Sequence, residues 1–262
     1  EGQNPGGSVK DRAALNMIRS AMEAGRITQS TKLVEATSGN TGIALAMIAR
    51  LYGIEIELIM PENATRERVQ TMRAYGARVT LTPAAGGIEE ARDMADQRVR
   101  QEGFVMLDQF SNPDNWKAHY KSTGPEIWDD TQGKVTHFVS SMGTTGTIMG
   151  TSSFLKEKNP EITIVGVQPD GDSSIPGIRK WPKAYLPKIF DASKVDRIIE
   201  VSAAEARETA RDLTSEEGIF AGMSSGGATA AALKLAKELK SGTIVSIICD
   251  RGDRYLSSDL FE

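Results

Sequence analysis

Short runs of β-branched and other apolar residues alternate along this chain with segments of helical periodicity. Runs of this kind occupy residues 32–36, 54–61, 77–83, 104–109, 134–141, 162–169, 196–202 and 243–250. Most of the segments between them repeat apolar residues at the spacing of an amphipathic helix, and several end at glycine. Strands that alternate with helices are joined by right-handed crossovers, which produces largely parallel sheets with helices on both faces. The sequence therefore predicts an α/β fold.

A break in this pattern at residues 111–115, with the sequence SNPDN, predicts a division into two α/β lobes. We expect a smaller N-terminal lobe over residues 1–113 and a larger C-terminal lobe over residues 114–262, each with a mostly parallel twisted sheet. Residues 116–130 are predicted to be helical, with an interruption at their Gly-Pro pair. Residues 173–196 hold three prolines and little periodicity, so we expect a long loop there, and such loops are often functional.

The composition excludes several classes of protein. Of the 262 residues, 39% are apolar and 25% are charged, and the net charge of −4 gives no basic stripe for nucleic acid or an anionic membrane. The apolar stretches are shorter than a bilayer span and no signal peptide is recognisable, so we expect a soluble, cytoplasmic protein. One cysteine, Cys249, and two histidines, His119 and His137, predict neither a disulfide nor a metal site. Because the chain begins without methionine, inside an element already under way, we expect it to be part of a longer protein.

The first residues, NPGGSVKD, place a lysine where a helix is expected to begin. Asn4 to Gly7 form a turn, and Ser8 is predicted as the N-cap, with Asp11 three residues later completing an imperfect capping box. Lys10 then lies in the first helical turn, where the helix dipole and unpaired N–H groups disfavour a cation. An amine whose charged form is destabilised is a better nucleophile at neutral pH, so Lys10 is a candidate for a Schiff base with a carbonyl cofactor. The alternative is an ordinary solvated lysine.

Ligands of parallel α/β sheets bind beyond the carboxyl ends of the strands, and two loops at such positions have suitable chemistry. The loop after the first predicted strand offers hydroxyls and backbone N–H groups for a carboxylate, and its residues are Thr37, Ser38, Gly39, Asn40 and Thr41. The loop after residues 134–141 suits a phosphate, and its residues are Gly143, Thr144, Thr145, Gly146 and Thr147. This second loop lacks the lysine of a nucleoside-triphosphate loop and the spacing of a dinucleotide fingerprint. For the first loop, a simple helix cap of small residues is an equal alternative.

A third loop, GMSSGG at residues 222–227, matches the nucleophile elbow of serine hydrolases around Ser224. In α/β-hydrolases the catalytic histidine follows the serine, whereas His119 and His137 both precede it here. The alternatives are a turn that caps the following Ala-rich helix, or a hydroxyl directed at the same ligand as the other loops. Both histidines are expected to be structural, and Gln109 either faces the ligand or is satisfied by the backbone.

Taken in order along the chain, these motifs resemble those of the cysteine synthase family of fold-type-II pyridoxal-phosphate enzymes. The matching segments are NPGGSVKDRAA, EATSGNTG, DQFSNPDN, SSMGTTGT and RGDRYLS, and the resemblance covers essentially the whole chain. The segments SSMGTTGT, SSIPGIRKWP and IICDRGDRYLS are similar to those of the B-type members, the O-acetylserine sulfhydrylase B group. The resemblance implies a two-lobed fold like that of the tryptophan synthase β chain.

The resemblance also implies a role for each candidate residue. Lys10 would carry pyridoxal 5'-phosphate as a Schiff base and then remove the Cα proton of the substrate. Asn40 would bond the ring oxygen of the cofactor, its neighbours in the loop together with Gln109 would bind the substrate carboxylate, and Ser224 would contact the pyridine nitrogen. Residues 143–147 would hold the phosphate. A hydroxyl does not force the ring nitrogen to be protonated, which favours loss of a β-leaving group over transamination.

The implied reaction is β-replacement, in which O-acetyl-L-serine loses acetate to give an α-aminoacrylate and sulfide adds to give L-cysteine. A basic patch that would include Arg179, with Trp181 and Cys249 nearby, implies thiosulfate as a second donor, giving S-sulfocysteine. Lys180 stands where the pattern has a second arginine, and lysine lacks the planar fork that binds an oxyanion bidentately. The family implies a homodimer. A serine or threonine dehydratase and a cystathionine β-synthase-type enzyme share these motifs and are the alternatives.

Overall fold

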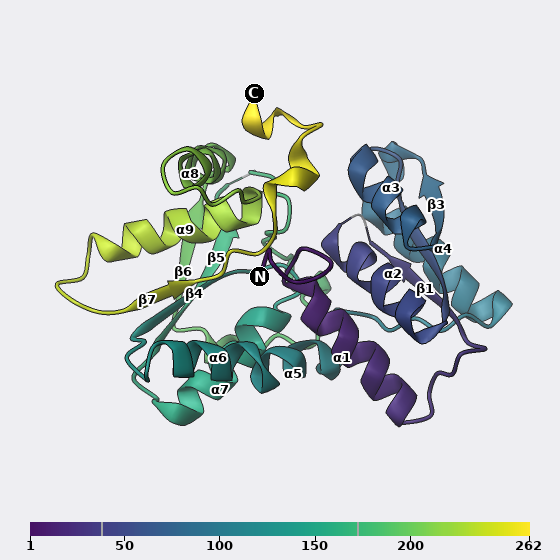
Figure 1. Cartoon of the computed structure of the whole chain (residues 1–262), viewed down its shortest axis with the longest axis horizontal. Helices are drawn as coiled ribbons and strands as arrows, with labels where there is room; N and C mark the ends of the chain where they lie inside the picture. Colours follow the sequence, from purple (N-terminus) through teal and green to yellow (C-terminus); the bar gives the residue numbers. More distant parts are fainter. Residues whose placement is uncertain (38, 172) are drawn as a thin grey trace. The chain divides into compact units, whose positions relative to one another are not determined.

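The chain forms two compact α/β units in the computed structural model, which describes residues 1–37, 39–171 and 173–262 (Figure 1). One unit comprises Asn4–Gln109, and the other comprises Glu1–Gln3 with Phe110–Glu262. Each unit contains a parallel sheet flanked by helices. The predicted α/β class with two lobes is therefore confirmed.

The Asn4–Gln109 unit has a sheet with strand order β1-β2-β3, in which neighbouring strands are parallel. Its strands are β1 (Lys32–Ala36), β2 (Glu55–Pro61) and β3 (Arg78–Thr82). Its helices are α1 (Lys10–Glu23), α2 (Asn40–Tyr52), α3 (Arg66–Ala74) and α4 (Gly87–Glu102), with a 3-10 turn at Ala84–Gly86. The strands match the apolar runs from which they were predicted.

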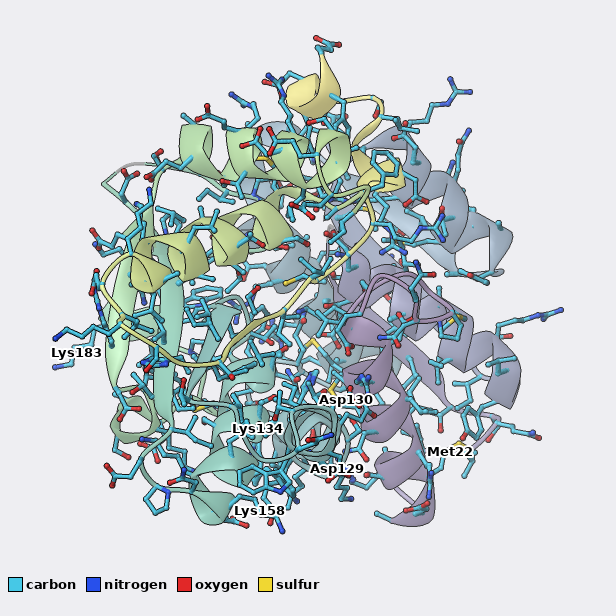
Figure 2. All side chains as sticks on the ribbon, turned by 60° about the vertical axis from the view of Figure 1, so that its left-hand side comes forward. Met22, Asp129, Asp130, Lys134, Lys158 and Lys183 are labelled. Carbon is cyan, nitrogen blue, oxygen red and sulfur yellow. The ribbon has the colours of Figure 1, made fainter. Side chains whose placement is uncertain are left out.

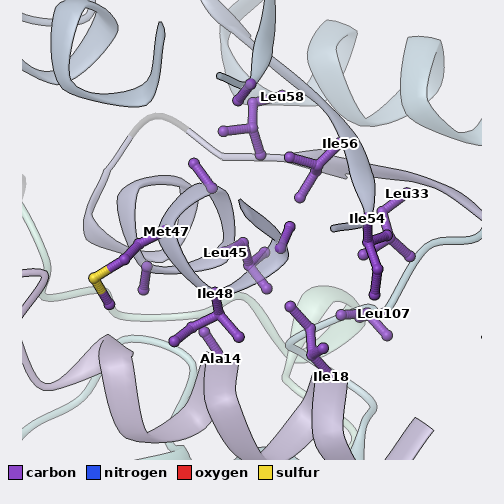
Figure 3. Packing of buried hydrophobic residues seen from close by; sticks show 14 of the residues in the cluster. Ala14, Ile18, Leu33, Leu45, Met47, Ile48, Ile54, Ile56, Leu58 and Leu107 are labelled. Carbon is purple, nitrogen blue, oxygen red and sulfur yellow. The ribbon is translucent and has the colours of Figure 1, made fainter. Parts of the chain in front are cut away.

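Helices cover both faces of this sheet. Successive strand residues point to opposite faces, so neighbouring residues pack against different helices. Leu58 belongs to a buried cluster with residues of α1 and α2, including Ile18 and Ile48 (Figure 3). The next residue, Ile59, packs instead with Ala91 of α4. Helix α2 is buried along most of its length, which explains why its sequence is apolar on every side.

The Phe110–Glu262 unit has a second parallel sheet, with strand order β6-β5-β4-β7. Its strands are β4 (His137–Ser141), β5 (Thr163–Pro169), β6 (Arg197–Val201) and β7 (Ile244–Ser246). Its helices are α5 (Pro113–Lys121), α6 (Thr123–Asp130), α7 (Gly146–Lys158), α8 (Ala203–Ser215) and α9 (Met223–Ala236). Short 3-10 turns cover Lys183–Tyr185, Ala192–Lys194, Gly252–Tyr255 and Asp259–Phe261.

The strand order of this second sheet reverses at β4. The chain proceeds from β4 to β5 and β6 on one side and returns to β7 on the other side of β4. Such a switch point is where ligands bind in open α/β sheets, beyond the carboxyl ends of the strands. Helices α8 and α9 lie on one face of the sheet, and α5, α6 and α7 lie on the other (Figure 1).

Three predicted elements are corrected by the structure. In the run 104–109 only Val105 pairs, with Leu33, because the chain leaves the sheet and turns at Asp108, whose φ is +51°. The run 243–250 yields only β7. The predicted helix over 116–130 breaks at Ser122 instead of at its Gly-Pro pair, because Pro125 cannot extend α5 and is accommodated in the first turn of α6.

Charged side chains mark the exposed ends of α6 and α7. Asp129 and Asp130 end α6, and Lys158 ends α7 (Figure 2). Residues 173–196 contain only 3-10 turns and one isolated bridge among the residues described there, in line with the predicted long loop, and Lys183 in this loop is exposed (Figure 2). Throughout the described part of the chain, every helix is too short or too polar to cross a lipid bilayer.

Candidate active site

The predicted site residues fall into two sets, one on each unit. The first set consists of Lys10, Thr37, Gly39, Asn40, Thr41 and Gln109, and the second of Gly143 to Thr147, Arg179 and Ser224. Ser38 lies outside the described residues.

Lys10 is the first residue of α1 and is half-buried. The turn before it is confirmed, since the N–H of Gly7 donates to the carbonyl oxygen of Asn4 at 2.7 Å. Gly7 has a φ of +78°, which glycine adopts without strain. The NPGG sequence thus reverses the chain just before the helix and places the lysine at its first turn.

The predicted capping box is wrong. The residue before α1 is Val9, which has helical dihedrals and no capping side chain. The Ser8 hydroxyl accepts from the N–H of Lys10 at 3.3 Å, whereas the carboxylate of Asp11 accepts from the N–H of Gly6 at 2.5 Å. The turn brings Gly6 so close that a Cβ built there would lie 2.5 Å from Asp11 Oδ1. The hydrogen bond from Gly6 to Asp11 therefore connects the Asn4–Gly7 turn to α1 and fixes the position of Lys10.

The loop from Thr37 to Thr41 joins β1 to α2 and is tied to the end of the unit by Gln109. Thr37, Thr41 and Gln109 are buried. The Thr41 hydroxyl donates to Gln109 Oε1 at 2.7 Å, although these residues are 68 positions apart in the chain. Around Gly39 a built Cβ would meet no atom within 4 Å, so this side of the loop is open. The N-terminus of α2 carries the positive end of the helix dipole, which favours a carboxylate.

Glu35 supports the strained backbone that carries Gln109. It is a buried residue of β1, and its Oε2 accepts from the N–H of Asp108 at 3.3 Å. Burial, and next the negative charge of Asp108, raise the pKa of the Glu35 carboxyl to about 8, although hydrogen bonds from the backbone at residues 107–109 oppose this. Glu35 is thus largely protonated at neutral pH. Glu35 begins the segment EATSGNTG, but no role was predicted for it from the sequence.

The phosphate loop, residues Gly143 to Thr147, lies between β4 and α7, at the switch point of the sheet. Thr145 is the N-cap of α7 and has a φ of +70°, which is unfavourable for a β-branched residue. Its Oγ1 is buried and has no hydrogen-bond partner among the described residues. Strain and an unsatisfied hydroxyl together are typical of a functional site.

This loop has the chemistry that a phosphate requires. The N-terminus of α7 supplies backbone N–H groups and the positive end of the helix dipole, and three threonines supply hydroxyls. The loop carries no carboxylate that would repel an anion. The Thr144 hydroxyl accepts from Asn115 Nδ2 at 3.2 Å, and a Cβ on Gly146 would lie 2.0 Å from Asn115 Oδ1. Asn115 therefore shapes the loop from α5, and only glycine fits at position 146.

Ser224 lies in the first turn of α9 and is 4% exposed. Its carbonyl oxygen accepts from the Ser141 hydroxyl, at the end of β4, at 2.7 Å. Gly177 approaches so closely, with a φ of +88°, that a Cβ there would lie 3.1 Å from Ser224 Oγ. The two imidazoles of the chain contact other hydroxyls, His119 those of Thr123 and Thr147 and His137 that of Thr136. The geometry therefore gives no support to a Ser-His hydrolase.

Arg179 is fixed beside the phosphate loop by Trp181. The N–H of Arg179 donates to the carbonyl oxygen of Met142 at 2.8 Å, and its guanidinium lies 5.5 Å from the Trp181 ring centroid. Trp181 Nε1 donates to the carbonyl oxygen of Gly143 at 2.7 Å. Lys180 is directed elsewhere, because its Nζ forms an ion pair with Glu200 at 2.6 Å. Of these two neighbouring cations, Arg179 is the one tied to the loop.

Sequence reasoning missed two side chains of α5 that contact the phosphate loop. His119, expected to be only structural, and Asn115 both contact loop threonines. They lie four residues apart in α5, so they share one face of that helix. That spacing was the available signal, but nothing local indicated which helix the face would contact.

Comparison with known proteins identifies the family of this chain. The family model described as "Pyridoxal-phosphate dependent enzyme" matches residues 1–250. Cysteine synthase B from Pseudomonas aeruginosa is 58% identical over 262 residues, which is 100% of this chain and 88% of the relative. This chain belongs to the cysteine synthase family, B type. Pyridoxal phosphate is the cofactor of the family, as the resemblance implied.

Two solved structures confirm the fold of the family. O-ureido-L-serine synthase has a TM-score of 0.94 at 37% identity, covering 100% of this chain and 85% of that one. A cysteine synthase from Entamoeba histolytica has a TM-score of 0.92 at 37% identity, covering 97% of this chain and 78% of that one. The predicted fold-type-II architecture is therefore confirmed.

Proposed function

We propose that this chain catalyses the pyridoxal-phosphate-dependent replacement of the acetoxy group of O-acetyl-L-serine by sulfide, giving L-cysteine and acetate. The observation that carries the proposal is the phosphate loop after β4, where the buried Thr145 hydroxyl at the start of α7 has no hydrogen-bond partner within the described part of the chain. When bound, the cofactor supplies an electron sink that labilises the substrate Cα proton and the β-leaving group. The similarity to cysteine synthase B supports this choice of substrates.

The residues of the chain would divide the work as follows. Lys10 Nζ would hold the cofactor covalently and later take the substrate Cα proton. Asn40 would bond the ring oxygen, while the Thr37–Thr41 loop, assisted by Gln109, would bind the substrate carboxylate. Ser224 would face the pyridine nitrogen with a hydroxyl. The 143–147 loop would bind the phosphate, and a homodimer in the cytoplasm is the state that we propose for the enzyme.

A lysine substitution tests the covalent role of Lys10. Borohydride reduction of the wild-type holoenzyme should fix the cofactor to a peptide that contains Lys10, as measured by mass spectrometry. Lys10→Ala should yield no adduct, whereas Lys134→Ala, which removes an exposed lysine whose Nζ donates to Gln132 Oε1 at 3.3 Å, should keep it. An adduct retained in Lys10→Ala would exclude Lys10 as the attachment site.

Product analysis decides which nucleophile the enzyme uses. O-acetyl-L-serine should be supplied with sulfide, thiosulfate, homocysteine or water alone, and the products separated. Cysteine from sulfide is the expected main product. Predominant pyruvate or cystathionine would instead assign a dehydratase or a cystathionine-forming enzyme on the same scaffold.

We further propose that thiosulfate is accepted through Arg179. A charge-assisted hydrogen bond is worth about 1.5–3 kcal/mol, so Arg179→Ala should lower kcat/KM for thiosulfate by about 10- to 100-fold and leave sulfide nearly unaffected. Lys180→Ala is the matched control, because its amine is paired with Glu200. Equal losses for both sulfur donors in Arg179→Ala would show that the residue acts on folding or on the cofactor instead.

A further inference from the structure

His119 is a buried histidine whose two ring nitrogens each face a threonine hydroxyl. It lies in α5 with 1% of its surface exposed. Its Nδ1 is 2.8 Å from Oγ1 of Thr123, and its Nε2 is 3.4 Å from Oγ1 of Thr147. Thr123 begins α6, and Thr147 belongs to the phosphate loop at the start of α7. The imidazole therefore joins the loop to a second hydroxyl outside it.

The crossing of α5 and α7 holds the imidazole in place. At Gly150 the two helices approach so closely that a built Cβ would lie 2.0 Å from the carbonyl oxygen of Trp116 and 2.8 Å from Cβ of His119. Gly150 follows Thr147 by three residues, so both lie on the face of α7 that contacts α5. The close crossing therefore fixes the Cβ of His119 beside α7.

The chemistry of a phosphate restricts the hydrogen bonds of Thr147. Phosphate oxygens accept hydrogen bonds, and a hydroxyl has a single proton to donate. If Thr147 donates that proton to a phosphate, any further neighbour of its oxygen has to be a donor. His119 Nε2 is such a neighbour, so it has to carry a proton, and a neutral imidazole then has a bare Nδ1 that accepts from the Thr123 hydroxyl.

We propose that His119 is a positioning residue of the phosphate site, held as the Nε2–H tautomer between Thr123 and Thr147. It donates to Thr147 and thereby directs the Thr147 proton at the phosphate. This inference rests on the proposed phosphate site at residues 143–147. In the opposite tautomer, Nε2 would take the Thr147 proton, and the hydroxyl would present its lone pairs to an anion.

The tautomer can be measured in the wild-type holoenzyme. The chain has only two histidines, so ¹⁵N-histidine labelling gives two ring systems, and the His137→Gln variant identifies which signals belong to His119. We expect a protonated Nε2 and a bare Nδ1 for His119. A protonated Nδ1 with a bare Nε2, or a doubly protonated ring, would overturn the proposal.

Two substitutions test the energetic consequence. The amide of Gln can place an N–H donor near the position of Nε2, whereas the shorter Asn reaches only the position of Nδ1. We therefore expect His119→Asn to raise the cofactor dissociation constant by about 10-fold or more, and His119→Gln to raise it only a few-fold. Similar weakening by both variants would contradict the proposed donor role.

Thr147→Val separates failure of this inference from failure of the phosphate site. If Thr147→Val leaves cofactor affinity unchanged, the assignment of the phosphate site is wrong. If Thr147→Val weakens binding but His119→Asn does not, the phosphate site stands and the role of His119 is refuted. The expected result is that both weaken binding and that the double variant is no weaker than Thr147→Val alone, because His119 acts through that hydroxyl.

Discussion

Replacing Glu35 with glutamine should change how the stability of this protein depends on pH. The carboxyl is buried, and its pKa is raised from 4.5 to about 8, chiefly by burial. Between these two values the folded protein holds a proton that the unfolded chain has released. Folding is therefore linked to proton uptake, and the contribution of Glu35 to stability falls as the pH rises from 4.5 through 8.

The magnitude follows from the two pKa values. At about 1.4 kcal/mol for each tenfold change in proton affinity, the difference between 4.5 and about 8 corresponds to about 5 kcal/mol. Glu35→Gln removes this dependence because an amide does not titrate. At pH 4.5 the variant should be the less stable protein, by about 1–3 kcal/mol, since the amide cannot satisfy the backbone donors equally well. Above pH 8 it should be the more stable one.

The assay is urea unfolding of both holoenzymes, followed by circular dichroism at a series of pH values with the cofactor concentration held constant. Glu55→Gln, an exposed glutamate of β2 in the same unit, is the matched control and should run parallel to the wild type. The quantity to compare is the difference in unfolding free energy between variant and wild type. If that difference stays constant from pH 4.5 to 9, Glu35 does not titrate in this window and the reasoning is refuted.

Three further substitutions test the loops and the helix crossing. Thr145→Gly relieves a left-handed conformation that costs a β-branched residue about 1–2 kcal/mol. The free energy of unfolding should change by less than about 1 kcal/mol, while cofactor affinity should fall about tenfold. Unchanged cofactor affinity would argue against a role for the Thr145 hydroxyl. Gly150→Ala places a Cβ 2.0 Å from the carbonyl oxygen of Trp116 and should lower the free energy of unfolding in urea by at least about 1–3 kcal/mol. An unchanged free energy of unfolding would contradict the close crossing of α5 and α7. Thr41→Val removes the hydrogen bond to Gln109 and should raise KM for O-acetyl-L-serine more than it lowers kcat, whereas a pure kcat effect would separate this pair from substrate binding.

The sequence by itself determined most of the strands, the α/β class and the loops that follow the strands. The runs at 32–36, 54–61 and 77–83 became β1, β2 and β3, because short runs rich in β-branched and other apolar residues favour strands. Turns such as NPGG were equally readable, because proline fixes its own φ and glycine accepts the positive φ that a tight turn requires. The order of the motifs also identified the family.

Only the tertiary structure decided the features that depend on partners distant in the chain. Asp108 turns out of the expected strand, and its N–H donates to Oε2 of the buried Glu35, 73 residues earlier. Lys180 is paired with Glu200. Local sequence sets conformational preferences of about 1 kcal/mol per residue, whereas burial and close packing between distant segments are worth several, so packing overrules the local preference wherever the two disagree.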